Sequence, residues 1–391
     1  MRFGRLLKKC ISLFCTAVLC VAVFAACAPP QDSNSEVTGS SGSAGLIPAG
    51  RMDLLYADQF SVDYYEGGYS LVTIKDSGEF LLVPEGAAVP EGLSEDTIIL
   101  QLPLQNIYLA ASAAMDLFRK LGALDSVRMT GTKASDWAIP EIAEMVESGQ
   151  ISYGGKYSAP DYEMLLSNSC DLAIESTMIY HTPKVKEQLE RIGIPVMVER
   201  SSYETHPLGR VEWIRLYGLL TGKEAEAESF MEECSERFTT LTDMAETGSK
   251  KTVAFFYVAS NGAVNVRKPG DYISKMIELA GGEYIFADLI PEEENALSTV
   301  NMQMEAFYEK AVDADILIYN STVQTELKEL EELMEKSELF RDFKAVKEGN
   351  VWCTGQNMYQ EITGTIDMLE DFYSIINDGQ DAEPVYLHLL K

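Results

Sequence analysis

The chain has 391 residues, and its 61 acidic side chains outnumber 31 basic ones, which gives a formal net charge of −30 at pH 7. A surface this negative repels phosphate backbones, which argues against nucleic acid as a partner. The length, with 46% apolar residues, is enough for two domains.

Residues 1–26 predict a signal peptide. Four basic residues within the first nine positions precede the uncharged apolar run "ISLFCTAVLCVAVFAA" at residues 11–26. The run is shorter than the roughly 20 residues of a membrane-spanning helix. It ends in small residues directly before Cys27, an arrangement that resembles a bacterial lipobox. We therefore expect Cys27 to carry a lipid and to anchor the chain at the extracytoplasmic face of the cell membrane; ordinary signal cleavage nearby is the alternative.

The next segments predict a tether and a small sheet. Residues 27–48 are rich in Pro, Ser and Gly and nearly free of apolar side chains, so they are typical of a flexible tether. Residues 51–86 carry β-branched and aromatic residues with turn signals at "EGG" and "DSG", which predicts an antiparallel meander. Residues 97–104, "TIILQLPL", are predicted to form the first strand of a lobe, and the segment from Asn106 to Gly122 is predicted to be an amphipathic helix.

Strands and helices then alternate. Predicted strands at residues 170–177 and 194–201 flank a predicted helix at residues 183–193, the pattern of a right-handed βαβ unit on a parallel sheet. The second half repeats this plan, with a strand at residues 251–259 and a charged helix at residues 323–340 among its elements. We therefore predict two α/β lobes, an N-terminal lobe at residues 49–222 and a C-terminal lobe at residues 249–391.

A helical segment separates the lobes. Pro207 suits the first turn of a helix that ends at Gly222. Residues 223–248 then predict the interlobe segment, with a second helix from Lys223 to about Glu246. At about 36 Å this helix is stiff enough to join two lobes while allowing only modest rocking.

The segment "ETHPLGRVEW" at residues 204–213 is dense in polar side chains and invites a catalytic interpretation. We favour a structural one, in which Arg210 and Glu212 tie the first lobe to the interlobe helix. A ligand contact from Arg210 on the hinge side is a weaker alternative.

Taken in order, these elements resemble the helical-backbone (class III) solute-binding proteins of ABC importers, a family that includes receptors for ferric siderophores, haem and cobalamin. The phrase "LERIGIPVMV", for example, is similar to the family's "L…GIPV". The sequence departs from the family where Pro-(Ser/Asn)-Thr-Glu usually follows the first strand and "PLQNIY" stands here. Five segments carry the resemblance: residues 157–176, 189–198, 276–286, 300–319 and 343–352.

The resemblance implies two Rossmann-like lobes joined by one long α-helix, with the N-terminal β-meander as an addition. It also implies that one glutamate on each lobe pairs with arginines of the permease, and by position these are Glu163 and Glu305. Two fixed carboxylates suit such docking because complementary charges steer the encounter of two proteins.

Ligand residues are expected in loops at the carboxyl ends of the strands, where open α/β sheets bind their ligands. Aromatic side chains there could stack on a macrocycle or a catecholate, and Arg267 could pair with an anionic chelate. The principal candidates are Asn106, Tyr108, Trp137, Thr177, Met178, Tyr180, Tyr257, Arg267 and Tyr359. Gln105, Ser176, Asn261, Asn320, Ser321 and Met358 occupy the same loops.

Histidine content argues against a receptor for bare metal ions, since the 3 histidines are not spaced as a pair. Haem could still be held by Tyr, Met or His181. No resident cofactor, catalytic motif or disulfide framework is indicated. The predicted protein is a monomeric lipoprotein that captures an iron chelate, haem or corrinoid and delivers it to an ABC permease and its ATPase without acting as an enzyme. A secreted enzyme on a similar scaffold and a surface sensor or adhesin are the alternatives.

Overall fold

The computed structural model describes residues 45–245, 250–290, 298–322 and 325–391. The chain divides into Met1–Ser40 and a compact unit, Ser41–Lys391, to which all described residues belong. The predicted signal peptide, Cys27 and nearly all of the predicted tether lie outside the described residues.

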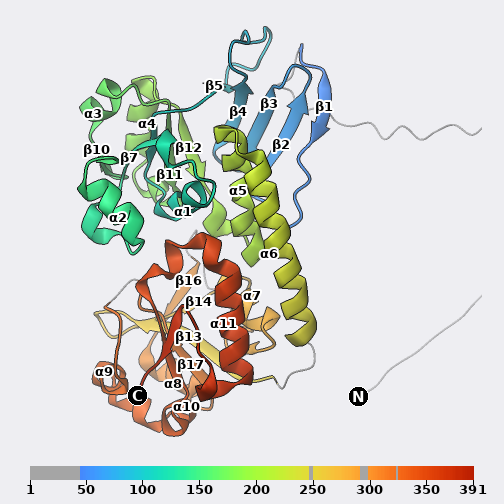
Figure 1. Ribbon diagram of the computed structural model, residues 1–391. Coiled ribbons are helices and arrows are strands. Elements are labelled where there is room, and N and C mark those ends of the chain that lie inside the picture. Colours follow the sequence, from blue (N-terminus) through green and yellow to red (C-terminus); the bar gives the residue numbers. More distant parts are fainter. Residues whose placement is uncertain (1–44, 246–249, 291–297, 323–324) are drawn as a thin grey trace, which may run out of the picture. The chain divides into compact units, whose positions relative to one another are not determined.

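The described part begins with a five-stranded sheet in the order β1-β2-β3-β4-β5, here called the N-terminal sheet (Figure 1). Neighbouring strands are antiparallel except β4 and β5, which are parallel. Alternate residues of β3 and β4 face a large core and a smaller one that includes Leu71 and Leu81, as expected for a sheet covered on both faces. The strands are β1 (Pro48–Arg51), β2 (Phe60–Tyr65), β3 (Ser70–Ile74), β4 (Gly78–Val83) and β5 (Ile98–Gln101).

The N lobe has its own five-stranded parallel sheet, in the order β12-β11-β6-β7-β8. Its strands are β6 (Ile107–Leu109), β7 (Val127–Thr130), β8 (Ser152–Tyr153), β11 (Leu172–Ser176) and β12 (Val196–Glu199). Its helices are α1 (Ser112–Lys120), α2 (Pro140–Glu147), α3 (Tyr162–Ser167) and α4 (Pro183–Arg191), and the short strands β9 (Gly155–Lys156) and β10 (Ala159–Pro160) precede α3.

Two sequence predictions for this lobe are wrong. The strand predicted at residues 97–104 is β5, which pairs with β4 in the N-terminal sheet, so it is not the first strand of the lobe. That strand is β6, at the start of the segment predicted to be helix, and α1 begins only at Ser112. Three consecutive apolar residues satisfy a buried strand and a buried helix equally well, so the pattern alone could not separate them. The phrase "PLQNIY" therefore begins before the first strand and runs into it, rather than following it.

The C lobe contains a seven-stranded mixed sheet, in the order β16-β14-β13-β17-β18-β19 with β15 beside β13. Its parallel centre is β13 (Thr252–Val258), β17 (Ile316–Tyr319) and β18 (Val351–Thr354). The remaining strands are β14 (Val264–Arg267), β15 (Glu283–Tyr284), β16 (Thr299–Met302) and β19 (Leu387–Leu389). The helices are α7 (Tyr272–Leu279), α8 (Met304–Ala311), α9 (Leu330–Lys336), α10 (Lys344–Glu348) and α11 (Thr365–Asn377).

The charged helix predicted at residues 323–340 is too long. Residues 323–324 lie outside the described residues, and α9 covers only Leu330–Lys336. Ser337 ends it in an extended conformation, and its hydroxyl accepts the Leu339 N–H to start a separate 3₁₀ turn. A serine that competes with the backbone in this way ends a helix without any glycine or proline signal.

Two consecutive helices connect the lobes. In α5 (Pro207–Thr221) a proline occupies the first turn, and Gly222, with φ of +67°, ends the helix in the left-handed conformation that glycine adopts without strain. After this turn, α6 (Glu224–Ala245) runs for 22 residues, about 33 Å, and packs against α5 and α11 (Figure 1). The predicted fold, two α/β lobes joined by a long helix with an added N-terminal sheet, is confirmed.

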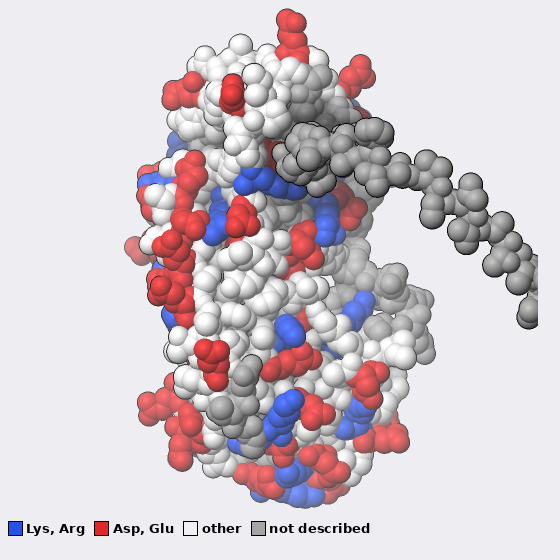
Figure 2. Space-filling model, turned by 90° about the vertical axis from the view of Figure 1, so that its right-hand side faces the viewer, with Lys and Arg blue, Asp and Glu red and all other residues white. Residues whose placement is uncertain are grey.

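The surface agrees with the acidic composition. Acidic side chains lie at the top, along one side and at the base of the face in Figure 2, with basic side chains among them and uncharged surface between. Among the described helices, none combines the length and the apolar character needed to cross a membrane.

Candidate functional site

Two side chains link the N lobe to the C lobe. The Gln360 amide, after β18, accepts the Ala138 N–H (2.7 Å) and donates to the Asp136 carbonyl (2.8 Å) in the loop after β7. The buried Asp116 carboxylate in α1 accepts the backbone N–H (2.8 Å) and the hydroxyl (2.6 Å) of Thr363. These contacts place the segment after β18 against helix α1 and against the loop after β7, so strand-end loops of both lobes meet, as a binding surface between them requires.

Arg210, in the first turn of α5, is a buried cation with little compensation. Its side chain is 5% exposed, its guanidinium lies 3.9 Å from the centre of the Tyr272 ring, and its Nε has no hydrogen-bond partner. Among the described residues no carboxylate forms an ion pair with it. The nearby Glu199 carboxylate accepts the Ser201 N–H instead, and burial raises the pKa of Glu199.

Arg267, on β14, faces the same Tyr272 ring at 5.9 Å and the Tyr359 ring at 5.2 Å. It donates to the Ser298 hydroxyl (2.8 Å) and lies 3.6 Å from Asp271, and its Nε is also without a partner. Burial raises the pKa of Asp271, against the charge of Arg267, which opposes that rise. Two buried guanidinium groups thus share one aromatic ring, and within the described residues only Arg267 has a carboxylate in ion-pair range. We call Arg210, Arg267 and Tyr272 the arginine cluster.

Aromatic and amide groups adjoin this cluster. Tyr359 accepts a hydrogen bond from the Asn320 amide (3.1 Å), and Met358 beside it is buried. Trp137 lies between the two residues that Gln360 binds; its side chain is 7% exposed and its indole N–H has no partner. A buried N–H without an acceptor is costly, so such a group suits a ligand oxygen. The structure therefore brings together the predicted residues Arg267, Tyr359 and Asn320, with Trp137 on the adjoining loop.

Several other predicted ligand residues lie outside this group. Thr177, Met178 and Tyr180 lie in the 3₁₀ turn after β11, where Met178 and Tyr180 are exposed and the Tyr180 hydroxyl accepts from Arg200 (3.1 Å). Ser321 is buried and bonded to Thr354. Three more of the predicted residues lie near strand ends and are half-buried or exposed: Ser176, Tyr257 and Asn261.

Three predicted positions are wrongly placed because the first strand was misassigned. The N–H groups of Gln105 and Asn106 both donate to Asp171 (2.9 Å each), at the amino end of the N-lobe sheet, opposite the edge expected to bind ligand. Tyr108 lies within β6, is fully buried and donates to the Gly155 carbonyl (2.7 Å). Its side chain belongs to the core.

The two glutamates predicted to dock onto a permease occupy equivalent places in the two lobes. Glu163 lies in the first turn of α3 and Glu305 in the first turn of α8, and both are exposed. Among the described residues, neither has an ion-pair partner. Both carboxylates are thus available to an external cation, and their docking role stays a prediction.

The polar side chains of residues 204–213 hold neighbouring segments in place, which favours the structural interpretation of this segment over the catalytic one. The fully buried Glu212 carboxylate accepts three backbone N–H groups at 2.7 to 2.9 Å, those of Leu55, Tyr56 and Ala57. Glu204 accepts the N–H groups of Asp58 and Gln59 and the indole N–H of Trp213. The His206 ring stacks on Tyr56, with centroids 4.7 Å apart. Glu212 therefore holds the segment between β1 and β2. Its role in tying the lobe to the interlobe helix stays a prediction.

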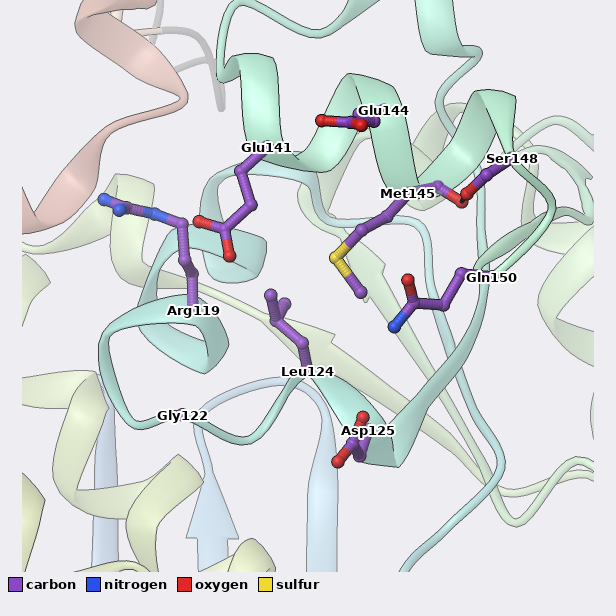
Figure 3. Close-up of a pocket in the computed structure, with 9 residues that line it drawn as sticks. All are labelled: Arg119, Gly122, Leu124, Asp125, Glu141, Glu144, Met145, Ser148 and Gln150. Atoms are coloured by element: carbon purple, nitrogen blue, oxygen red, sulfur yellow. Dashed lines mark hydrogen bonds between the residues drawn. The ribbon is translucent and has the colours of Figure 1, made fainter.

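A hollow of about 490 Å³ lies beside α1 and α2, away from the arginine cluster. Figure 3 shows the side chains of Leu124, Glu141 and Met145 directed into it. Arg119 at its rim is already paired with Asp116 (2.6 Å). None of the predicted ligand residues lines this hollow, whose walls are Arg119, Gly122, Leu124, Asp125, Glu141, Glu144, Met145, Ser148 and Gln150.

Sequence reasoning missed Tyr272 and Gln360 and gave Arg210 a secondary place. Tyr272 looks like an ordinary first-turn residue of α7, and the partners of Gln360 are more than 220 positions away in the chain. No local pattern identifies residues that acquire a role only when two lobes meet.

Comparison with known proteins supports this architecture. The sequence profile of a family described as periplasmic binding protein matches residues 109–358. An uncharacterized lipoprotein of Methanocaldococcus jannaschii is 24% identical over 403 aligned residues, which cover 95% of this chain and 93% of the relative.

Two solved structures are similar in fold. One is a periplasmic haem-binding protein of Pseudomonas aeruginosa, with a TM-score of 0.57 and 14% identity over 73% of this chain and 98% of the other. The other is the periplasmic catecholate-siderophore binding protein VctP of Vibrio cholerae, with a TM-score of 0.55 and 15% identity over 69% of this chain and 93% of the other. The resemblance predicted from the sequence motifs is confirmed, and the chain belongs to the periplasmic binding protein family.

Proposed function

We propose that the protein is the extracytoplasmic solute-binding component of an ABC importer, and that it captures an anionic iron chelate between the strand-end loops of its two lobes. A siderophore complex is the first choice, and haem or a corrinoid are the related ligands. The observation that carries this proposal is the arginine cluster, where two buried guanidinium groups each keep an unpartnered Nε. Buried charge of this kind is costly unless a partner compensates it, and an anionic ligand is such a partner.

The surroundings of the cluster favour a planar or aromatic ligand. Tyr272 and Tyr359 face the guanidinium groups, and Trp137 has an indole N–H free to donate. Aromatic faces stack on catecholates and macrocycles, and guanidinium groups bind carboxylate or catecholate oxygens in pairs. Similar folds that bind haem and a catecholate siderophore agree with this ligand class.

The remaining parts of the proposal concern the membrane. Cys27 would carry the lipid, as the lipoprotein relative suggests. The exposed carboxylates of Glu163 and Glu305 would pair with permease arginines, and the permease with its ATPase would be the partner of a monomeric receptor.

An enzymatic role is not favoured by the one segment that suggested it. The carboxylates of Glu204 and Glu212 are already occupied by N–H donors. Burial, and then the charge of Lys275, lowers the pKa of His206 to about 4, so this half-buried ring is neutral at physiological pH and stacked on Tyr56. We therefore propose that the ligand is bound and released without chemical change.

The test is a titration of the full-length chain, purified in detergent, with intrinsic tryptophan fluorescence as the readout. The probes are a ferric tris-catecholate, haemin, cyanocobalamin, ferric citrate and the free ions Fe³⁺ and Zn²⁺. We expect saturable quenching by an iron chelate, and a loss of affinity of about tenfold or more in Arg210→Gln and in Arg267→Gln, because each removes a charge-assisted hydrogen bond. Arg237→Gln is the matched control, since Arg237 pairs with Asp367 and Glu370 on the surface. The proposal fails if no probe binds, or if the control loses as much affinity as the cluster variants.

A further inference from the structure

The turn between β3 and β4 reaches the edge of the N-lobe sheet. The Ser77 hydroxyl in this turn accepts the Val198 N–H (2.8 Å) from β12, the outermost strand of that sheet. Val198 is the last residue but one of β12, so the contact lies at the carboxyl end of the strand. The N-terminal sheet is therefore attached at the edge of the lobe where ligand loops are found.

Arg200, directly after β12, connects the turn to those loops. Its Nη1 donates to the Tyr180 hydroxyl (3.1 Å) and pairs with the Asp76 carboxylate (3.1 Å). Its Nε donates to the Gln59 amide oxygen (3.2 Å), and the guanidinium lies 4.6 Å from the Tyr203 ring centre. One buried guanidinium thus joins the loops after β11 and β12 to the N-terminal sheet.

Asp76 presents its charge at this edge. It has a φ of +54°, a left-handed conformation that aspartate tolerates better than most residues, and its side chain is 77% exposed. Among the described residues it is the only carboxylate in ion-pair range of Arg200. Its neighbour Tyr180 is 37% exposed, and Met178 in the same loop is 45% exposed. The open part of this edge therefore combines an accessible carboxylate with accessible apolar surface.

We propose that the N-terminal sheet forms part of the ligand-binding surface and that Asp76 is a specificity-determining residue. Its carboxylate pairs with Arg200 and cancels the positive charge that this end of the surface would otherwise present. Anionic groups of the ligand therefore find no uncompensated cation at the Tyr180 end and are directed to the arginine cluster. Withholding a complementary charge at one end of a site discriminates between ligands of similar shape. This inference rests on the proposed function, because it assigns a role within the same binding surface.

The test compares Asp76→Asn with Asp63→Asn in the full-length chain. Asparagine keeps the shape of the side chain and tolerates a positive φ, so the turn keeps its conformation. Asp63 is a matched control because it pairs with Arg51 (3.5 Å) in the same sheet, on β1 and β2 rather than at the lobe edge. The probes are a ferric tris-catecholate, which carries several negative charges, and cyanocobalamin, which has no net charge. Thermal unfolding checks that each variant folds.

We expect Asp76→Asn to bind the ferric tris-catecholate about three- to tenfold more tightly than the wild type, with the gain shrinking at high salt. Affinity for cyanocobalamin should not change, and Asp63→Asn should match the wild type for both probes. Equal effects of the two substitutions, or no tightening by Asp76→Asn when the wild type binds the chelate, would overturn the inference alone. A wild-type chain that binds neither these probes nor those of the earlier titration would overturn the proposed function and this inference together.

Discussion

Glu212 has the clearest task of any single side chain in the molecule. Its buried carboxylate accepts three backbone N–H groups from Leu55, Tyr56 and Ala57. In Glu212→Gln the amide group has one acceptor oxygen and an NH₂ that faces N–H donors, so at least one buried donor loses its partner. We expect the free energy of unfolding in urea to fall by about 1–3 kcal/mol. Glu228→Gln, at an exposed glutamate that pairs with Arg215, is the control and should change little. Equal losses in both variants would contradict this assignment.

The buried carboxyl group of Glu175 is expected to make the stability of the protein depend on pH. It is fully buried on β11, neither carboxyl oxygen has a partner, and burial raises its pKa to about 8. The folded state therefore retains a proton that the unfolded state releases near pH 4.5. The ionisation of Glu175 therefore does not affect the free energy of unfolding below about pH 4.5, and it lowers that free energy as the pH rises towards 8.

The matching variant is Glu175→Gln, which keeps the shape of the side chain and removes the titration. At pH 8 we expect it to be more stable than the wild type by on the order of 4 kcal/mol, and near pH 4.5 the difference should vanish. Urea unfolding at both pH values measures this. Glu163→Gln, at an exposed position of the same lobe, should show no such difference. A constant offset between Glu175→Gln and the wild type at both pH values would refute the prediction.

These residues mark the limit of prediction from sequence at this scale. Arg267 and Tyr359 were predicted as ligand residues because each lies close to a strand end, a local property. Glu212 and Leu55 are 157 positions apart, and nothing in either neighbourhood indicates the other. Glu175 looked like one of many acids, because burial depends on which helices cover the strand.

At the scale of elements, the turn between α5 and α6 depends on Gly218. A Cβ at this position would lie 2.9 Å from the Ala227 Cβ, shorter than real Cβ contacts, and 3.0 Å from the Lys223 carbonyl oxygen, at their lower limit. Gly218→Ala would push the two helices apart, and we expect a loss of about 1–3 kcal/mol in the free energy of unfolding despite the better helix propensity of alanine. Ser229→Ala, on the exposed face of α6, is the control and should be neutral or slightly stabilising. A stable Gly218→Ala variant would show that the helices can separate without cost.

Elements were predicted well where their pattern is long or punctuated, and poorly where it is short. The helices α5 and α6 follow from Pro207, Gly222 and a sustained apolar period. In contrast, β6 has three residues and β5 four, and each is defined by its partners rather than by its own sequence. Because "TIILQLPL" could pair with any sheet, its membership of the N-terminal sheet could not be read from the chain, and the misplacement of Asn106 and Tyr108 followed.

At the scale of the whole molecule, the order of lobes and connecting helices was predictable because the family motifs occur in sequence along the chain. Which loops meet was not predictable, since that depends on the packing of one lobe against the other. The two links between lobes illustrate this: Asp116 and Thr363 are 247 positions apart, and Gln360 and Ala138 are 222 apart.

The Gln360 link yields a prediction about the lobes as a pair. The Gln360 side chain accepts the Ala138 N–H and donates to the Asp136 carbonyl, so it is the one residue that closes both bonds of this link. In Gln360→Ala the Ala138 amide loses its acceptor, and we expect its hydrogen exchange to speed up about tenfold, which corresponds to about 1.4 kcal/mol of lost protection. Gln380→Ala is the matched control, because Gln380 donates to the Glu348 and Gly349 carbonyls within one lobe. If the two links act together, the Thr363 amide, held by Asp116, also exchanges faster in Gln360→Ala but not in Gln380→Ala. Unchanged exchange at Ala138 would mean that the lobes are held together without this glutamine, and acceleration at Ala138 alone would mean that the links open independently.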